Sequence, residues 1–271
     1  MDLTIILLAL VPGLIFGSFL GALTYRLPRG ESIFKGRSKC PNCGKKIAWY
    51  DNIPIFSYIL LGRKCRHCKK SISSRYFWIE LLTSLLFFGA YFLFLECSSG
   101  VYSAAIKTPA CIWEGVLGGA FLPFVLLVTL TVTTIFVIDL EHQFIPDELV
   151  FFGTTLVFLA IVLFNPSTFY LNMLSALGAG VSLLLIHLAT KGEGMGLGDV
   201  KFAIFAGLIL GWPYTPVFLF LSFLTGAAVG IILILINKAK FKQQIAFGPF
   251  LIVSLIATFI LGDKIIALFL P

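Results

Sequence analysis

The chain has 271 residues, of which 59% are hydrophobic and only 12% are charged. A soluble domain carries roughly twice that charged fraction, so the composition excludes an ordinary soluble protein and predicts an integral membrane protein. The net charge of +7 does not indicate nucleic-acid binding, because thirteen of the twenty Lys and Arg lie between Arg26 and Arg75. A basic loop between hydrophobic spans is the usual mark of the cytoplasmic side.

Eight apolar segments approach the ~20 residues that a helix needs to cross the hydrocarbon core of a bilayer. The sixth is short and ends at Trp212-Pro213. This pattern predicts an all-α polytopic membrane protein with about eight transmembrane helices. A small cytoplasmic insert that resembles a zinc ribbon completes the predicted fold class. The predicted spans are residues 4–24, 77–95, 117–138, 149–164, 171–190, 200–211, 214–236 and 245–262.

Charge sets the orientation of these spans. No basic residue precedes the first span, whereas Arg26 and Arg29 follow it. This favours an uncleaved first span with the N-terminus outside. Alternation then predicts that the loops at 26–76, 139–148, 191–199 and 238–244 lie inside, and the last of them carries Lys238, Lys240 and Lys242, as the positive-inside rule expects.

The segment 26–76 is the one long stretch that is poor in apolar runs, and it divides the chain into three predicted parts. These are a first transmembrane helix (1–25), a cytoplasmic basic loop (26–76) and a seven-helix transmembrane domain (77–271).

The basic loop contains two CxxC pairs, Cys40-Cys43 and Cys65-Cys68, with 21 residues between them. Four thiolates at such spacing can close a tetrahedral zinc site. The site is predicted to be structural, because four protein ligands leave no position open for a substrate. A reducing cytoplasm argues against the alternative of disulfides. A small insert with little core also needs such a staple to fold.

Two further cysteines, Cys97 and Cys111, flank a loop predicted to lie outside, where disulfides persist. A bridge and two free thiols both remain open at this point, since pairing depends on geometry.

Two aspartates stand at the ends of apolar runs. Asp139 follows the run 121–138, and Asp199 closes the glycine-rich segment 194–198. A carboxylate at a membrane boundary is costly and usually marks function. Each also has an ordinary interpretation, Asp139 as an interfacial charge and Asp199 as a helix N-cap. If the two carboxyls share a site, however, they form an acid and base pair that can hydrolyse a peptide bond.

Several short motifs accompany the two aspartates along the chain. They are Gly17-Ser18-Phe19-Leu20, Tyr25-Arg26-Leu27-Pro28, the paired CxxC loop with Asn52-Ile53-Pro54-Ile55 and Ser73-Ser74-Arg75-Tyr76, Asp139-Leu140-Glu141, Ile145-Pro146-Asp147, Gly196-Leu197-Gly198-Asp199-Val200-Lys201 and Phe247-Gly248-Pro249-Phe250-Leu251. Together they resemble the motifs of the type IV prepilin peptidases, bifunctional leader peptidases and N-methyltransferases of the GxGD aspartyl protease class. One departure is Gly21, where the family often has Asn.

The resemblance implies a membrane aspartic endopeptidase with Asp139 and Asp199 as its catalytic pair. It implies a multi-pass protein of the bacterial inner membrane, with eight spans and an active site that faces the cytoplasm. The implied reaction removes the leader from a prepilin or pseudopilin, in type IV pilus assembly or protein secretion, and methylates the new N-terminus with S-adenosylmethionine. The expected partners are that substrate and membrane lipid, and no nucleic acid.

Substrate contacts are predicted close to the aspartates. Glycine permits close backbone approach by an extended peptide, and acidic side chains attract a basic leader. The residues predicted to bind the substrate are Gly196, Gly198, Lys201, Glu141 and Asp147.

The helix dipole distinguishes the two carboxyls. Asp139 is expected at the C-terminal end of its helix, where negative charge is disfavoured, and Asp199 at the N-terminal end of another, where it is favoured. Asp139 is therefore predicted to hold the shared proton and Asp199 to act as the base, and Lys201 is expected to strengthen that bias. His187 is expected to make an interhelical hydrogen bond. Glu80 remains open between an interfacial acid and a member of the cytoplasmic site.

Three other functions compete with the protease. A scaffold whose zinc insert docks a partner would tolerate loss of both aspartates, and a transporter with two acids as a proton relay would show proton flux in sealed vesicles. A cysteine protease is disfavoured, because CxxC pairs make better ligands than nucleophiles and no His or Asn partner is evident.

Overall fold

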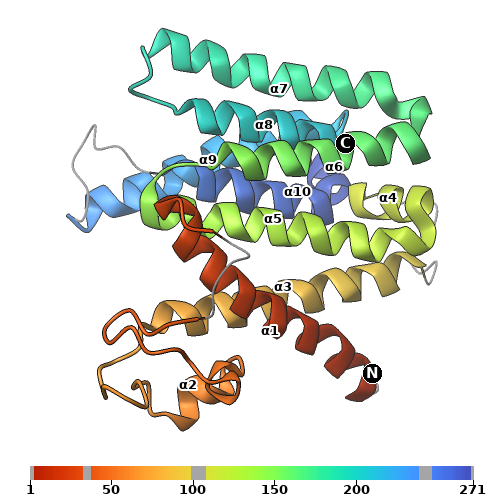
Figure 1. Cartoon of the computed structure of the whole chain (residues 1–271). Helices are drawn as coiled ribbons and strands as arrows, with labels where there is room; N and C mark the ends of the chain where they lie inside the picture. The colour runs from red at the N-terminus through yellow and green to blue at the C-terminus, as the bar shows by residue number, and fades with distance from the viewer. Residues whose placement is uncertain (1–2, 33–37, 99–107, 238–245, 270–271) are drawn as a thin grey trace. The chain divides into compact units, whose positions relative to one another are not determined.

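The computed structural model describes residues 3–32, 38–98, 108–237 and 246–269, and in these ranges it contains helices and no β-strand (Figure 1). Four short 3-10 turns are also described: η1 (Leu27–Arg29), η2 (Trp49–Asn52), η3 (Gly118–Ala120) and η4 (Pro166–Thr168). The α-helices of the described residues are α1 (Leu3–Arg26), α2 (Phe56–Leu60), α3 (Ser74–Ser98), α4 (Pro109–Leu117), α5 (Phe121–His142), α6 (Asp147–Phe164), α7 (Phe169–Ala189), α8 (Leu197–Leu210), α9 (Tyr214–Leu235) and α10 (Gly248–Phe269).

All eight predicted spans coincide with helices. Seven helical stretches of the described chain are long and apolar enough to cross a membrane, which confirms the all-α polytopic class. The exception is α8, whose 14 residues extend about 21 Å and fall short of a bilayer core of about 30 Å. The predicted inside loop with Lys238, Lys240 and Lys242 lies outside the described residues.

One short helix is absent from the sequence prediction. The third predicted span begins at residue 117, but the structure has a separate helix, α4, before it. Gly118 ends α4 with a φ of +51°, a conformation that glycine adopts at no steric cost. The Thr108 hydroxyl caps its first turn by accepting from the Cys111 N–H.

The chain forms two compact units, and the first comprises residues 1–92 and 125–137. Within it, α1 and α3 pack backbone to backbone at two glycines four residues apart. A Cβ atom on Gly13 would lie 2.6 Å from the Ser84 Cα, and one on Gly17 would lie 2.7 Å from the Glu80 Cα. Small residues at this spacing let membrane helices approach closely. Leu20, Ile79 and Val137 form the buried cluster beside this contact.

The second unit comprises residues 93–124 and 138–271, and α8 lies at its centre. Helices α6, α7, α9 and α10 all contact α8, and most of its residues are buried. Gly207 of α8 lies against the Ala176 backbone of α7, where a Cβ atom would be 2.8 Å from the Ala176 Cα. Because α8 is covered by protein, it does not need the length of a lipid-exposed span.

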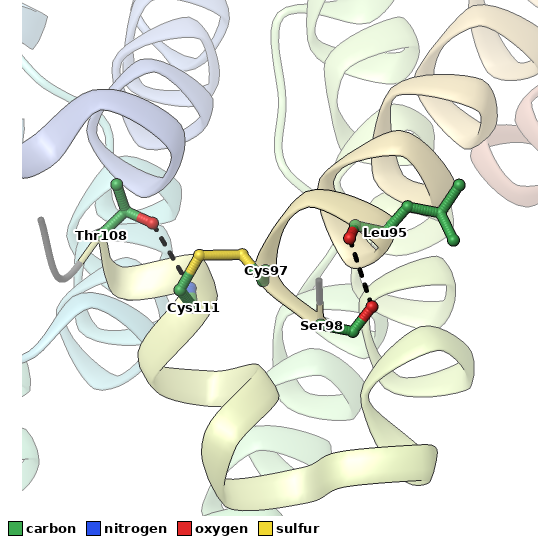
Figure 2. Close-up of a disulfide and its surroundings, with 5 residues drawn as sticks. All are labelled: Leu95, Cys97, Ser98, Thr108 and Cys111. Atoms are coloured by element: carbon green, nitrogen blue, oxygen red, sulfur yellow. Dashed lines mark hydrogen bonds between the residues drawn. A yellow bond between two sulfur atoms is a disulfide. The ribbon is translucent and has the colours of Figure 1, made fainter. Parts of the chain in front are cut away.

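A disulfide joins Cys97 at the end of α3 to Cys111 in α4, with Cα atoms 5.1 Å apart (Figure 2). The bridge left open by the sequence is therefore present in the structure. Nearby, the Trp113 indole donates to the Ile209 carbonyl at 2.8 Å, at the end of α8. These contacts fix α4 within the second unit.

Candidate active site

Asp139 lies in the last turn of α5 and is almost completely buried. The Gln143 N–H donates to the Asp139 carbonyl at 2.9 Å and closes the helix with Gln143 in the left-handed region. The Gly248 backbone amide at the start of α10 is directed at the Asp139 carboxyl. The Oδ2 atom of that carboxyl is buried and has no hydrogen-bond partner among the described residues. An ionised oxygen in that position would carry the full cost of desolvation.

Asp199 lies in the first turn of α8 and is also buried. Its Oδ2 atom accepts the Gly196 N–H at 3.1 Å. A carboxylate at a helix N-terminus that accepts a backbone N–H is favoured in its ionised form. The two carboxyls therefore differ in their hydrogen bonds, and which of them holds the shared proton stays a prediction.

Three chain segments meet around this pair, and Ile145 lies between them. A Cβ atom on Gly198 would be 3.0 Å from the Ile145 Cβ, and one on Gly248 would be 3.4 Å from the Ile145 Cδ1. The Cβ on Gly248 would also lie 2.9 Å from the Asp139 Cγ. Glycine at both positions thus leaves the room in which the loop after α5 and the starts of α8 and α10 come together.

The two carboxyls affect one another electrostatically. Asp199 lies outside the seven candidate spans. Burial raises the pKa of Asp199 to about 6, the Gly196 N–H opposes this rise, and the negative charge of Asp139 adds to it. A carboxyl that titrates near neutral pH and is backed by a second acid is suited to acid and base chemistry.

The predicted substrate contacts occupy different positions around the pair. Lys201 pairs with Asp147, with its Nζ atom 2.7 Å from both carboxylate oxygens, and both side chains are exposed. The Lys201 ammonium is therefore engaged with Asp147 rather than with Asp199. Glu141 follows Asp139 by two residues in the last turn of α5, Gly196 comes directly before α8, and both are exposed.

The loop that leads into α8 is folded around His187. The His187 Nδ1 atom lies 2.6 Å from the Met195 carbonyl oxygen, which precedes Gly196. Gly192, at a φ of +82°, lies against the imidazole ring, and the Gly194 N–H donates to the Thr190 hydroxyl at 3.2 Å. His187 thus bonds a loop backbone rather than a side chain of a neighbouring helix.

The four cysteines of the basic loop form one cluster. Their Sγ atoms all lie within 4.8 Å of one another, and those of Cys40 and Cys68 are 3.9 Å apart. The two turns that carry them are alike: Cys40 and Cys65 each begin a turn, and Gly44 and Lys69 each occupy its positive-φ position. A tetrahedral site with metal–sulfur bonds of about 2.3 Å has sulfurs about 3.8 Å apart, so this donor set fits a metal ion.

Sequence reasoning noted Gly248 and Ile145 as parts of motifs but not as members of the site. For Gly248 the sequence signal was the position of Gly248-Pro249 at the start of an apolar run, because Pro favours the first turn of a helix. That signal predicts a helix start, and it does not reveal which carboxyl lies against it. Glu80, which the sequence left open, is buried and accepts the Ile55 N–H at 2.7 Å within the first unit.

A multi-pass membrane protein that buries two carboxyls close enough to affect one another electrostatically has the chemical requirements of an aspartic hydrolase. Comparison with known proteins agrees. The model of the bacterial peptidase A24 N-terminal domain matches residues 11–94, and the model of the type IV leader peptidase family matches residues 124–231.

Individual relatives cover nearly the whole chain. The chain is 31% identical over 299 residues to a prepilin leader peptidase/N-methyltransferase of Stutzerimonas stutzeri, across 99% of this chain and 94% of the relative. A protein of the same name from Pseudomonas aeruginosa is 31% identical over 294 residues (97% and 92%), and one from Aeromonas salmonicida is 36% identical over 237 residues (84% and 72%). No solved structure matches the chain significantly. The chain belongs to the type IV leader peptidase family.

Proposed function

We propose that the chain is a membrane aspartic endopeptidase that removes the leader from type IV prepilins or pseudopilins and methylates the new N-terminal residue. The observation that carries the proposal is the burial of Asp139 and Asp199 close enough for the charge of Asp139 to raise the pKa of Asp199. The relatives named prepilin leader peptidase/N-methyltransferase support the choice of substrate and of the second reaction.

In the proposed mechanism Asp199 is the base and Asp139 is the acid. The ionised Asp199 carboxylate, held by the Gly196 N–H, takes a proton from the attacking water. The protonated Asp139 donates to the oxygen of the scissile carbonyl, and its Oδ2 atom is available because no described protein group engages it. As the C–N bond breaks, Asp199 passes its gained proton to the leaving amine, and a hydroxyl of the diol intermediate returns a proton to Asp139, so the resting pair is restored.

The substrate is proposed to lie along the backbone at the exposed Gly196 and the partly buried Gly198. Its basic leader is drawn by Glu141 and by the neighbouring Glu148, both of which are exposed. Asp147 contributes less of this attraction, because Lys201 neutralises it. Lys201 is then proposed to act through Asp147, by fixing the start of α6 against α8.

The active site is proposed to face the cytoplasm of the bacterial inner membrane, with the N-terminus outside. The disulfide supports this orientation independently of the charge pattern, since disulfides persist on the oxidising side of the membrane. Helix α5 begins shortly after Cys111 and has 22 residues, or about 33 Å. Asp139 at its far end then belongs to the opposite, cytoplasmic side.

The chain is proposed to comprise the first helix (1–25), the basic loop (26–76) and the peptidase domain (77–271). The cysteine cluster is proposed to hold a structural zinc ion within the basic loop. Zinc supplies a cross-link where the insert has few buried residues. The ligands are Cys40, Cys43, Cys65 and Cys68.

Cys40→Ser is expected to lower the zinc content from about one ion per chain to near zero. It should also speed trypsin cleavage within 26–76 by more than about tenfold, because metal binding is folding free energy here. Zinc is measured by elemental analysis of the purified protein, and cleavage by mass spectrometry. The matched control is Cys111→Ser, which removes a disulfide cysteine and should leave the zinc content unchanged. Zinc retained after Cys40→Ser would contradict the assignment.

S-adenosylmethionine is the expected methyl donor, and the basic insert at 26–76 is the region that we propose for its binding. No contact among the described residues assigns its ligands. The test of the whole proposal is incubation of the purified protein with a prepilin, with and without S-adenosylmethionine, followed by product mass. Leader loss supports the peptidase, and a further methyl mass supports the transferase. An intact prepilin under all conditions would refute the function.

A further inference from the structure

Helix α2 exposes an apolar surface outside the long spans. Three of its five residues, Phe56, Ile59 and Leu60, are exposed, and Leu60 has 82% of its surface exposed. We call these three side chains the α2 face. Tyr58 lies between them in sequence and instead packs on Phe77 of α3, with ring centroids 5.6 Å apart. A contiguous apolar face of this kind marks an interaction surface.

A strained turn ties α2 to a membrane-spanning helix. Ile55 has a φ of 61° and a ψ of −53°, and the Phe56 N–H donates to the Pro54 carbonyl across it at 2.6 Å. A β-branched residue in this conformation is a genuine outlier and persists only where the surroundings hold it. The buried Glu80 carboxylate provides that hold by accepting the Ile55 N–H at 2.7 Å.

The hydrogen bond from the Ile55 N–H to Glu80 fixes the depth of the α2 face relative to the bilayer. Glu80 comes six residues after the start of α3 at Ser74, which is about 9 Å along the helix axis. Trp78, in the same turns, is exposed on α3, and Trp is enriched where a span meets the headgroups. Figure 1 shows the loop that carries α2 folded back beside the first turns of α3. The α2 face therefore lies at the level of the lipid headgroups.

The charge around the α2 face has one sign. Arg63 and Lys64 come three and four residues after the end of α2 and are exposed. The only acid between residues 38 and 73 is Asp51, which is paired with Arg66 at 2.6 Å. An apolar helix face rimmed by Lys and Arg is the pattern of a surface that enters an anionic leaflet. The same charge would repel a basic leader. The exposed basic residues of the described insert are Arg29, Lys39, Lys45, Lys46, Arg63, Lys64, Arg66, Lys69 and Lys70.

We propose that the α2 face is a membrane-docking surface that inserts among anionic phospholipids of the leaflet where α3 begins. Phe56, Ile59 and Leu60 enter the acyl region, and the basic residues that follow bind the phosphate groups. Docking holds the cysteine cluster against the bilayer. The proposal stands independently of the peptidase activity.

The test is photo-crosslinking of the full-length, zinc-loaded protein in nanodiscs made of equal parts phosphatidylglycerol and phosphatidylcholine. A benzophenone amino acid replaces Phe56, and adducts on its peptide are identified by mass. We expect lipid adducts, with phosphatidylglycerol favoured about fivefold, the factor that one Lys or Arg near an anionic surface supplies. The positive control is the same replacement at Phe151, exposed on α6, and the negative control is at Phe202, fully buried.

Two results of the crosslinking experiment would contradict the docking of the α2 face in lipid. Absence of lipid adducts at position 56 while position 151 gives them, or adducts to protein in the presence of a prepilin, would overturn the proposal. Equal capture of both lipids would overturn the preference for anionic lipid.

A second experiment measures trypsin cleavage after Arg63 in the same nanodiscs. Glu80→Ala should speed it at least about fivefold by releasing Ile55, whereas Glu80→Gln keeps an acceptor oxygen and should not. Equal cleavage rates for Glu80→Ala and Glu80→Gln would contradict the role of the Glu80 hydrogen bond in holding Ile55.

Discussion

Asp139→Asn and Asp199→Asn are each expected to lower kcat/KM for leader cleavage by at least about 10³-fold, because either change removes one half of a proton relay. Both changes preserve the size of the side chain, and the amide oxygen introduced by Asp199→Asn can still accept the Gly196 N–H, so the fold should be retained. The measurement is cleavage of a prepilin by purified variants, read by product mass over time. The double variant should lose little more than either single one, since the two groups act as a unit.

The wild-type enzyme should lose activity as the pH falls through about 6. Burial raises the pKa of Asp199 to about 6, and the base must be ionised to accept a proton from water. Above that value the carboxylate is present, and below it the neutral acid replaces it, so kcat/KM has an acid limb there. A limb near pH 4, the ordinary range of an exposed aspartate, would contradict the buried environment of Asp199.

A matched control separates chemistry from folding. Asp263 in α10 accepts the Tyr214 hydroxyl at 2.7 Å, and it lies 15 residues along the helix from Gly248, or about 22 Å. Asp263→Asn keeps an acceptor for Tyr214 and should cleave within about twofold of wild type. Retention of full cleavage by Asp139→Asn or Asp199→Asn would remove the pair from the mechanism and leave the scaffold and transporter hypotheses.

Features that depend on composition and short spacing could be predicted from the sequence. The eight apolar segments all form helices, since a chain in a membrane must satisfy its backbone hydrogen bonds internally. The CxxC pairs bring four sulfurs together, because each pair forms its own turn. The end of α5 near Asp139 follows from the change from apolar to charged residues. Each of these is decided within a few residues along the chain.

Features that depend on where a helix begins were harder to predict. The sequence suggests that Lys201 biases Asp199, but α8 starts at Leu197, so both side chains lie on one helix two residues apart. Residues at that spacing do not face each other, and Lys201 reaches Asp147 instead. Glu80 could not be resolved because its partner is a backbone N–H in a strained turn, for which Ile55 gives no signal.

Gly248→Ala is expected to reduce leader cleavage at least about 100-fold, the cost of misplacing a catalytic group by about 1 Å. The new Cβ atom would lie 2.9 Å from the Asp139 Cγ and in contact with its Oδ2. Neither the buried carboxyl nor the backbone of α10 can move aside without disturbing Asp139. The measurement is single-turnover cleavage at saturating prepilin, which reports kcat rather than binding.

The size of this effect depends on the neighbour and not on the loss of glycine itself, and two further variants establish that. Gly230→Ala in α9 adds a Cβ with nothing within 4 Å, so it should cleave normally. Gly198→Ala meets the Ile145 Cβ at 3.0 Å, so the loop after α5 must shift by a few tenths of an ångström, and this variant should fall between the other two. If Gly248→Ala cleaved as well as Gly230→Ala, the start of α10 could not lie against Asp139, and the geometry proposed for the acid would be wrong.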